Sequence, residues 1–206
     1  MEIEILFSFI TASVVLTLMP GPDIVFVLMQ SISFGKKEGI LTALGLVSGI
    51  LVHTTLVAFG VSAVIKQSDN LFLGIKLFGA VYLCYLAYQV FQSDKGIEMN
   101  RLNAKPASTF KLIQKGFIMN VLNPKVTLFF LAFFPGFLFS NSMATITQFY
   151  ILGLLFMLQA MCVFIGISFF AGAFARFIKD NESLQVRIKW IQIVIFLLMA
   201  IFLILN

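Results

Sequence analysis

Charged residues are scarce in this sequence. Asp, Glu, Lys and Arg make up 11% of the 206 residues, whereas 60% of the residues are hydrophobic and the mean hydropathy is +1.03. A typical soluble domain carries about 25% charged residues, because its outer surface faces water. The composition therefore indicates an integral membrane protein without an appreciable soluble domain, and an enzyme of this kind would have to act inside the bilayer.

Cysteine and histidine are nearly absent. Cys84 and Cys162 lie too far apart for a C-x-x-C pair, and we expect both to be apolar thiols in the core. His53 is the one histidine and has no Cys or carboxylate neighbour at metal-ligand spacing, so we expect no metal site and no cofactor. The chain also lacks a G-x-x-x-x-G-K-[ST] motif, which argues against ATP-driven pumping by this chain.

Long apolar segments occupy most of the chain. They lie at 5–31, 39–65, 71–92, 112–139, 145–175 and 188–205. Because a helix needs about 20 residues to cross a membrane, the sequence predicts an all-α membrane protein with six transmembrane helices. The first segment follows Glu2 and Glu4 instead of a basic stretch, so we expect it to be a span and not a cleaved signal peptide.

The basic residues are sorted by loop. One set of loops holds eleven of the 14: Lys36, Lys37, Lys95, Arg101, Lys105, Lys111, Lys115, Arg176, Lys179, Arg187 and Lys189. An excess of Lys and Arg marks the cytoplasmic face, so we expect both termini to lie outside the cytoplasm. The net charge of +5 then predicts contact with anionic lipids at the cytoplasmic loops, and does not indicate binding of nucleic acid.

The first apolar segment is interrupted at Pro20-Gly21-Pro22-Asp23. Each proline lacks an N–H group, so the carbonyls of Leu16 and Leu18 lose their usual donors. Such a defect survives in hydrocarbon where protein or a water-filled cavity satisfies the free groups. A broken helix with a carboxylate at membrane depth predicts a transport site.

A second interruption follows 102 residues later, where Pro124-Lys125 matches Pro22-Asp23. Each break lies in the first helix of a three-helix set, which predicts repeats over 1–92 and 112–206, joined by a cytoplasmic linker over 93–111. An odd number of spans inverts the second repeat, and matched broken helices indicate a transporter binding site. The fold prediction is thus two inverted three-helix repeats with proline-broken first helices.

Asp23 and Lys125 are expected at similar depth near the middle of the membrane. A zwitterionic amino acid could replace their ion pair, with its ammonium on Asp23 and its carboxylate on Lys125 and the half-helix N-terminus. The carbonyl of Asn120 would accept further ammonium hydrogens, and Asn123 would either cap its half-helix or bind substrate. The alternative for Lys125 is a structural lysine that binds backbone carbonyls, and His53 is either a packing residue or a proton relay.

Several stretches of the sequence carry a resemblance to a known family. They are the two breaks, the basic turn Gly35-Lys36-Lys37, the 49–53 region and the run Asn120-Val121-Leu122-Asn123-Pro124-Lys125. Together they resemble the LysE/RhtB superfamily of amino-acid exporters. The resemblance covers most of the chain. It implies a multi-pass exporter of amino acids or close derivatives in the bacterial inner membrane, driven by proton antiport. With the orientation expected from the basic loops, both termini would be periplasmic. The family motif falls on Pro20, Gly21, Pro22, Asp23, Asn123, Pro124 and Lys125.

Two other classes of protein stay open at this point. An intramembrane enzyme would need a nucleophile with its base or a metal cluster, and a small-solute channel would need an oligomeric filter or charged rings. The sequence shows an isolated acid–base pair instead, so a secondary transporter is our leading hypothesis. The oligomeric state also stays open, with a homodimer as one alternative.

Overall fold

The structure is a computed structural model that describes residues 2–61, 69–92, 107–179 and 182–205. Every regular element in these ranges is helical, which agrees with the predicted all-α class. The elements are α1 (Glu2–Leu18), α2 (Pro22–Phe34), α3 (Lys36–Leu56), η1 (Val57–Val61), α5 (Asp69–Gln92), α6 (Thr109–Val121), α7 (Pro124–Leu128), η2 (Phe129–Phe133), η3 (Phe134–Phe137), α8 (Thr145–Lys179) and α9 (Glu182–Leu205).

Both predicted breaks appear as bends between consecutive helices. Ile3–Leu18 and Pro22–Phe34 meet at 59°, and Thr109–Val121 and Pro124–Phe137 meet at 49°. Among the described residues, three unbroken helices are long and apolar enough to cross a membrane: Lys36–Gly60, Thr145–Ala173 and Val186–Leu205. Each bent pair adds one more if it forms a single span. The predicted 71–92 segment is the 24-residue α5, which is not among these candidates, so six spans stay a prediction.

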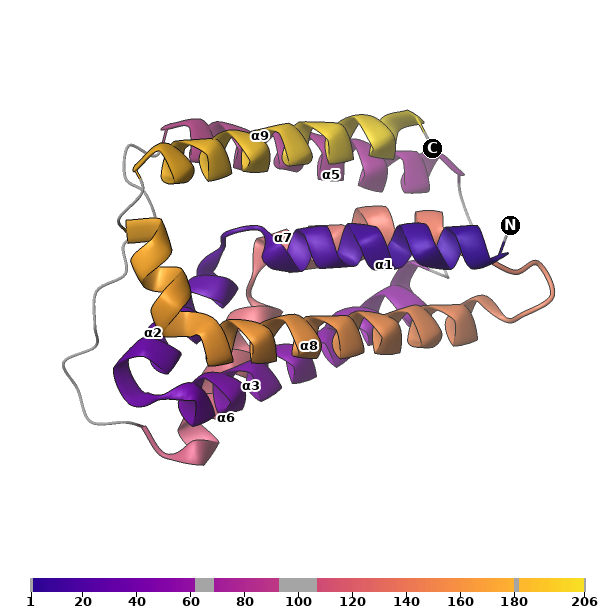
Figure 1. The fold of residues 1–206 in the computed structure, drawn as a ribbon. Coiled ribbons are helices and arrows are strands. Elements are labelled where there is room, and N and C mark those ends of the chain that lie inside the picture. Colours follow the sequence, from indigo (N-terminus) through magenta and orange to yellow (C-terminus); the bar gives the residue numbers. More distant parts are fainter. Residues whose placement is uncertain (1, 62–68, 93–106, 180–181, 206) are drawn as a thin grey trace.

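The helices run along a common direction in three tiers (Figure 1). α5 packs along α9 in one tier, α3 packs against α6 and α8 in another, and α1 and α7 lie between them. α1 begins and α9 ends at the same end of the bundle, and the two bent pairs run in opposite directions. This arrangement agrees with an inverted repeat, although the superposition of the two halves stays a prediction.

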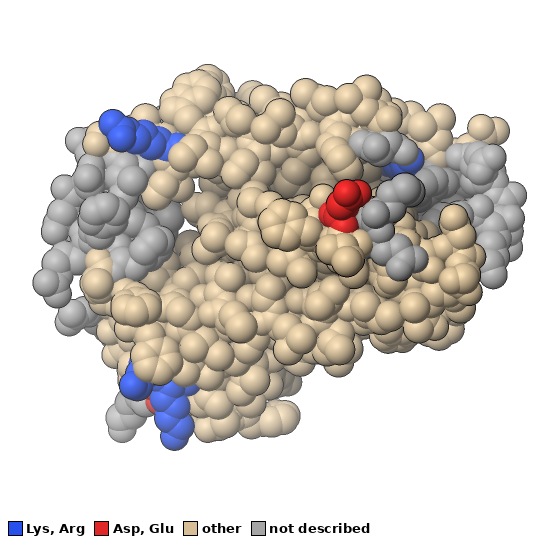
Figure 2. All heavy atoms as spheres, turned by 45° about the vertical axis from the view of Figure 1, so that its right-hand side comes forward, with Lys and Arg blue, Asp and Glu red and all other residues tan. Residues whose placement is uncertain are grey.

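The predicted linker 93–111 lies mostly outside the described residues, and so do Lys95, Arg101 and Lys105. The division of the chain into 1–92, 93–111 and 112–206 therefore stays a prediction. On the face in Figure 2, charged side chains are few and lie toward the two ends, with an uncharged surface between them. An uncharged band of this kind suits contact with hydrocarbon.

Close contact between α3 and α6 depends on glycine. A Cβ atom added to Gly45 would collide with the backbone carbonyl of Ile113, and one added to Gly116 would collide with that of Thr42. Small residues let membrane helices approach in this way. The two cysteines depart from the prediction: Cys84 and Cys162 are exposed, so placing them in the core was wrong. An apolar thiol is equally stable against lipid, which the sequence pattern could not distinguish.

Phenylalanines fill the bundle near the end where α1 begins. The largest fully buried side chains include Phe9, Phe129, Phe130, Phe134 and Phe149. Phe9 meets the rings of Phe134 and Phe137 edge-on, with centroids 5.4 and 5.3 Å apart. Such edge-to-face pairs are favourable beyond the burial of their area. This end of the core is therefore a closely packed cluster of phenylalanine rings beyond the two breaks.

Candidate functional site

The first break lies between α1 and α2. α1 ends at Leu18 and α2 begins at Pro22, as the missing proline donors predict. Gly21 precedes α2 in an extended conformation (φ −161°, ψ 176°), and no side chain caps the helix there. Asp23 stands in the first turn of α2 and is 4% exposed. Its carboxylate is stabilised by the free N–H groups at the helix N-terminus.

Two charged side chains come close to Gly21. A Cβ atom at this position would lie 2.8 Å from Asp23 Oδ1 and 3.1 Å from Lys125 Nζ. Carbon does not approach other heavy atoms so closely without repulsion. A larger residue at position 21 would therefore push the charged groups apart.

The second break lies between α6 and α7, and it carries its own cap. α6 ends at Val121 and α7 begins at Pro124. Asn123 is the N-cap residue, and its Oδ1 accepts a hydrogen bond from the backbone N–H of Lys125 at 3.1 Å. Asn123 Nδ2 is buried and has no hydrogen-bond partner among the described residues. The capping alternative thus describes Oδ1, and the role of Asn123 in substrate binding stays a prediction.

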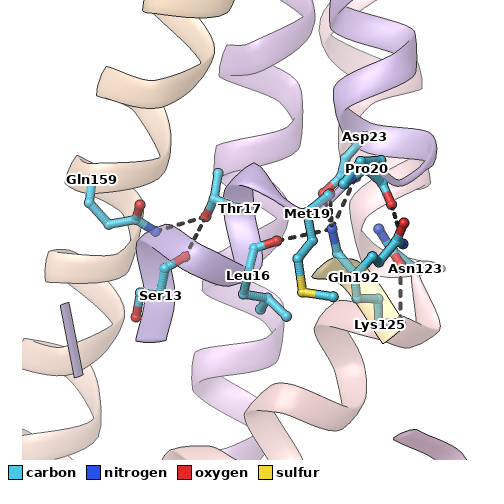
Figure 3. A network of polar contacts seen from close by, with 10 residues as sticks. All are labelled: Ser13, Leu16, Thr17, Met19, Pro20, Asp23, Asn123, Lys125, Gln159 and Gln192. Carbon is cyan, nitrogen blue, oxygen red and sulfur yellow. Dashed lines mark hydrogen bonds and ion pairs between the residues drawn. The ribbon is translucent and has the colours of Figure 1, made fainter. Parts of the chain in front are cut away.

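Lys125 brings the two breaks together (Figure 3). Its Nζ lies 3.3 Å from Asp23 Oδ2 and 3.4 Å from Asp23 Oδ1, and it donates to the carbonyls of Leu16 and Met19 at 3.2 Å each. Lys125 is 6% exposed. A cation buried this deeply needs both a counter-ion and further acceptors, and the first break supplies all of them.

The freed carbonyls of the first break differ in part from the prediction. Leu16 was expected to lose its donor, and its carbonyl is one that Lys125 contacts. The second such carbonyl belongs to Met19 and not to Leu18. Met19 follows the last residue of α1, so its carbonyl points out of the helix end toward the incoming ammonium.

Gln192 is a site residue that the sequence analysis missed. It lies in α9, and its Nε2 donates to the carbonyl of Pro20 at 2.8 Å. The one available signal was an amide in the largely apolar 188–205 segment. Its partner could not be predicted, because the contact joins residues that are far apart in the chain.

Asn120 and His53 meet on the other side of the site. His53 Nε2 donates to the carbonyl of Asn120 at 3.1 Å, and its ring lies 5.6 Å from that of Phe130. Asn120 Oδ1 is buried without a partner among the described residues, and a Cβ atom added to Gly49 would lie 2.7 Å from it. The same carbonyl accepts the backbone N–H of Asn123 at 2.9 Å, so His53 is its second donor. The Asn120 carbonyl is therefore not left free, which differs from the sequence-based expectation.

The cavity beside the ion pair is small. Its volume is about 10 Å³, which is room for about one water molecule. Its lining includes Leu16, Thr17, Asp23, Asn120, Lys125 and Phe156. An amino acid does not fit into this space while Lys125 contacts Asp23. Among the described residues, no group of three His, Cys, Asp or Glu side chains could hold a metal ion.

A larger apolar cavity lies on the other side of the first break. Its volume is about 330 Å³, and α1, α2, α8 and α9 contribute to its walls. Ile24 and Ile191 line it, as do Met19, Pro20 and Gln192. The first break therefore has tightly packed polar contacts on one side and open apolar space on the other.

These features define a class: a helical membrane protein whose two broken helices are joined by a buried ion pair. Comparison with known families gives the family. The model of the LysE type translocator family matches residues 14–206, and the chain belongs to this family.

Curated relatives resemble part of the chain. An uncharacterized membrane protein, YrhP, of Bacillus subtilis is 35% identical over 42% of this chain and 41% of its own length. An uncharacterized membrane protein of Vibrio cholerae is 33% identical over 43% of each chain, and a leucine efflux protein of Klebsiella pneumoniae is 34% identical over 49% of each. The chain thus matches about half or less of the length of these relatives. No solved structure gives a significant match.

Proposed function

We propose that this protein is a secondary active transporter that exports amino acids or close derivatives from the cytoplasm by proton antiport. The observation that supports it is the Lys125 ammonium, held between Asp23 and the carbonyls of Leu16 and Met19. An ammonium group in this place occupies a built cation site. The α-ammonium of an amino acid has the same charge and the same hydrogen-bond donors.

The substrate would enter by exchange with Lys125. Its ammonium takes the acceptors at Asp23, Leu16 and Met19, and the displaced Lys125 binds the substrate carboxylate. The free N–H groups at the α2 N-terminus would add to the attraction for the carboxylate. Asn123 Nδ2 and Asn120 Oδ1 are two of the buried groups that have no hydrogen-bond partner among the described residues, and both could then bind the substrate.

Proton coupling would follow from competition for Asp23. Its carboxylate can hold the Lys125 ammonium, the substrate ammonium or a proton, and each excludes the others. A proton that reaches Asp23 from outside releases the substrate ammonium there, and its loss to the cytoplasm restores the site. The relative named for leucine efflux makes leucine the first amino acid to test.

The orientation is part of the proposal. The basic ends of α3 and α6 would face the cytoplasm, and α1 would begin and α9 would end on the periplasmic side of a bacterial inner membrane. Anionic lipids would then bind the basic cytoplasmic face.

Counterflow in proteoliposomes tests the exchange. Purified protein would be loaded with unlabelled amino acid and assayed for uptake of the labelled form, with leucine first in the panel. We expect Asp23→Asn to abolish the pH dependence and proton-driven export, because it keeps the shape but loses the titratable charge. Lys125→Met should weaken substrate binding.

Two matched variants serve as controls. Glu38→Gln and Lys115→Met make the same chemical changes outside the site, where Lys115 lies over the ring of Phe26. Both should transport at the wild-type rate. The proposal is wrong if Asp23→Asn and Lys125→Met also transport at that rate with the same pH dependence. Uptake that needs no amino acid on the other side would point to a channel.

A further inference from the structure

A second polar cluster adjoins the ion pair. On α1, Ser13 and Thr17 are one turn apart and therefore share a face, and they are 0% and 4% exposed. Gln159 of α8 donates through Nε2 to Thr17 Oγ1 at 3.0 Å, and Thr17 donates to the carbonyl of Ser13 at 2.8 Å (Figure 3). Thr17 also lines the small cavity beside Asp23 and Lys125.

Two buried acceptor atoms in this cluster lack partners. Ser13 Oγ and Gln159 Oε1 have no hydrogen-bond partner among the described residues. The Ser13 hydroxyl differs from those of other helical residues in lacking a partner. The hydroxyls of Thr11, Thr17 and Ser168 each donate to the carbonyl four residues earlier. A buried polar atom without a hydrogen-bond partner is destabilising. Two of them in one cluster, which reaches the small cavity through Thr17, indicate a place where a polar ligand or water binds.

The cluster extends from the ion pair in one direction. Thr17 lies beside the cavity, and Ser13 lies about 6 Å further along α1 toward its beginning. One turn beyond Ser13, on the same face, is Phe9, which is fully buried against Phe134 and Phe137. Polar groups thus lead away from the cavity for one turn and end at an aromatic ring.

We propose that Ser13, Thr17 and Gln159 line a hydrated path from the ion pair toward the end of the bundle where α1 begins, and that Phe9 closes it. Water fills the path when Phe9 moves aside, and the charged ends of the substrate leave along it. This inference rests on the proposed transport function, because it assigns the outer half of that route. Ser13 Oγ and Gln159 Oε1 are the groups that this water and substrate would bind.

Cysteine labelling tests the path. In a background with Cys84 and Cys162 replaced by alanine, Ser13→Cys would be treated with a charged, membrane-impermeant thiol reagent. The matched control is Ser168→Cys, since Ser168 is also a buried helical serine, at 3% exposed, but its hydroxyl has a partner in the carbonyl of Phe164. We expect Ser13→Cys to react about tenfold faster or more, because its site opens to water during the transport cycle.

The aromatic closure is tested in the same background. Phe9→Leu removes the ring contacts while it keeps an apolar side chain, and it should raise the labelling rate of Ser13→Cys without affecting that of Ser168→Cys. Phe9→Ala should raise it further in protein that still purifies as a folded species. Equal rates at positions 13 and 168, or no change on replacing Phe9, would overturn the proposal.

The labelling result is independent of the transport result. If Ser13→Cys is labelled while Asp23→Asn and Lys125→Met still carry out counterflow, the path is real and the proposed ion-pair mechanism fails. If those two variants are inactive while Ser13→Cys stays protected, the mechanism stands and the path fails.

Discussion

The two helix breaks have the same proline chemistry but are stabilised in different ways. The second break caps itself, because Asn123 accepts from the backbone N–H of Lys125. The first break has Gly21 at the cap position and no side-chain cap, and it depends on Lys125 and Gln192 from the other half of the chain. A break held by distant contacts can change shape when those contacts exchange, whereas a self-capped break keeps its shape. We infer that the first break moves and the second serves as its fixed support.

The surroundings of the first break agree with this difference. The break has a cavity of about 10 Å³ on its polar side and one of about 330 Å³ on its apolar side. Closely packed helices do not move without space to move into. The larger space, which Ile24 and Ile191 line, is an apolar groove open to the surface, and it borders the start of α2.

The largest expected effect is the loss of Lys125. Lys125→Met should lower the free energy of unfolding by about 3–5 kcal/mol, because it leaves the buried Asp23 carboxylate without a counter-ion. The double variant Asp23→Asn/Lys125→Met should lose less than the single variant. Thermal unfolding in detergent measures both, with Lys115→Met as the control. If the double variant loses the sum of the two single losses, the first break does not depend on this ion pair.

The second-largest loss of stability is expected on replacing Gln192. Gln192→Leu leaves the Pro20 carbonyl unpaired in an apolar environment and should cost about 1–3 kcal/mol. Gln89→Leu makes the same change on α5, where Gln89 is exposed and bonds the Tyr85 hydroxyl. It should change the stability by about 0.5 kcal/mol or less. Equal losses at the two positions would show that α9 does not support the first break.

The self-capped break should be less sensitive. Asn123→Ala removes the cap and should cost about 1 kcal/mol, whereas Asn123→Ser keeps an acceptor and should cost less. Unfolding of the same preparations gives both values. A serine variant as unstable as the alanine variant would mean that Oδ1 capping is not what stabilises α7.

The smallest effect is expected at His53. His53→Gln can still donate to the carbonyl of Asn120, so both stability and the pH dependence of transport should stay close to wild type. His53→Phe cannot donate there and should be less stable than His53→Gln. A changed pH profile in His53→Gln would instead make His53 a proton relay.

The sequence predicted the positions of both breaks, since proline places a helix end directly, and it placed Asp23 and Lys125 at similar depth, which agrees with their contact. Their depth in a membrane stays a prediction. The Lys125 contacts with Leu16 and Met19 could be predicted in part. The carbonyl of Met19 was missed because the exact end of α1 decides which groups point into the gap. Gln192 was missed because its contact with Pro20 depends on how α9 packs, and no local pattern contains that information. The exposed positions of Cys84 and Cys162 could not be predicted either, because apolar residues suit both core and lipid.

The Lys125 side chain has a consequence for the working range of the protein under the proposed exchange. Its ammonium is tethered beside its own binding site, so its effective concentration there is about millimolar or higher. A free amino acid must compete with the Lys125 ammonium for the acceptors at Asp23 before it is transported. The transporter would then have a low apparent affinity for its substrate. It would export little while the cytoplasmic concentration of the amino acid is low, and export would rise once that concentration is high.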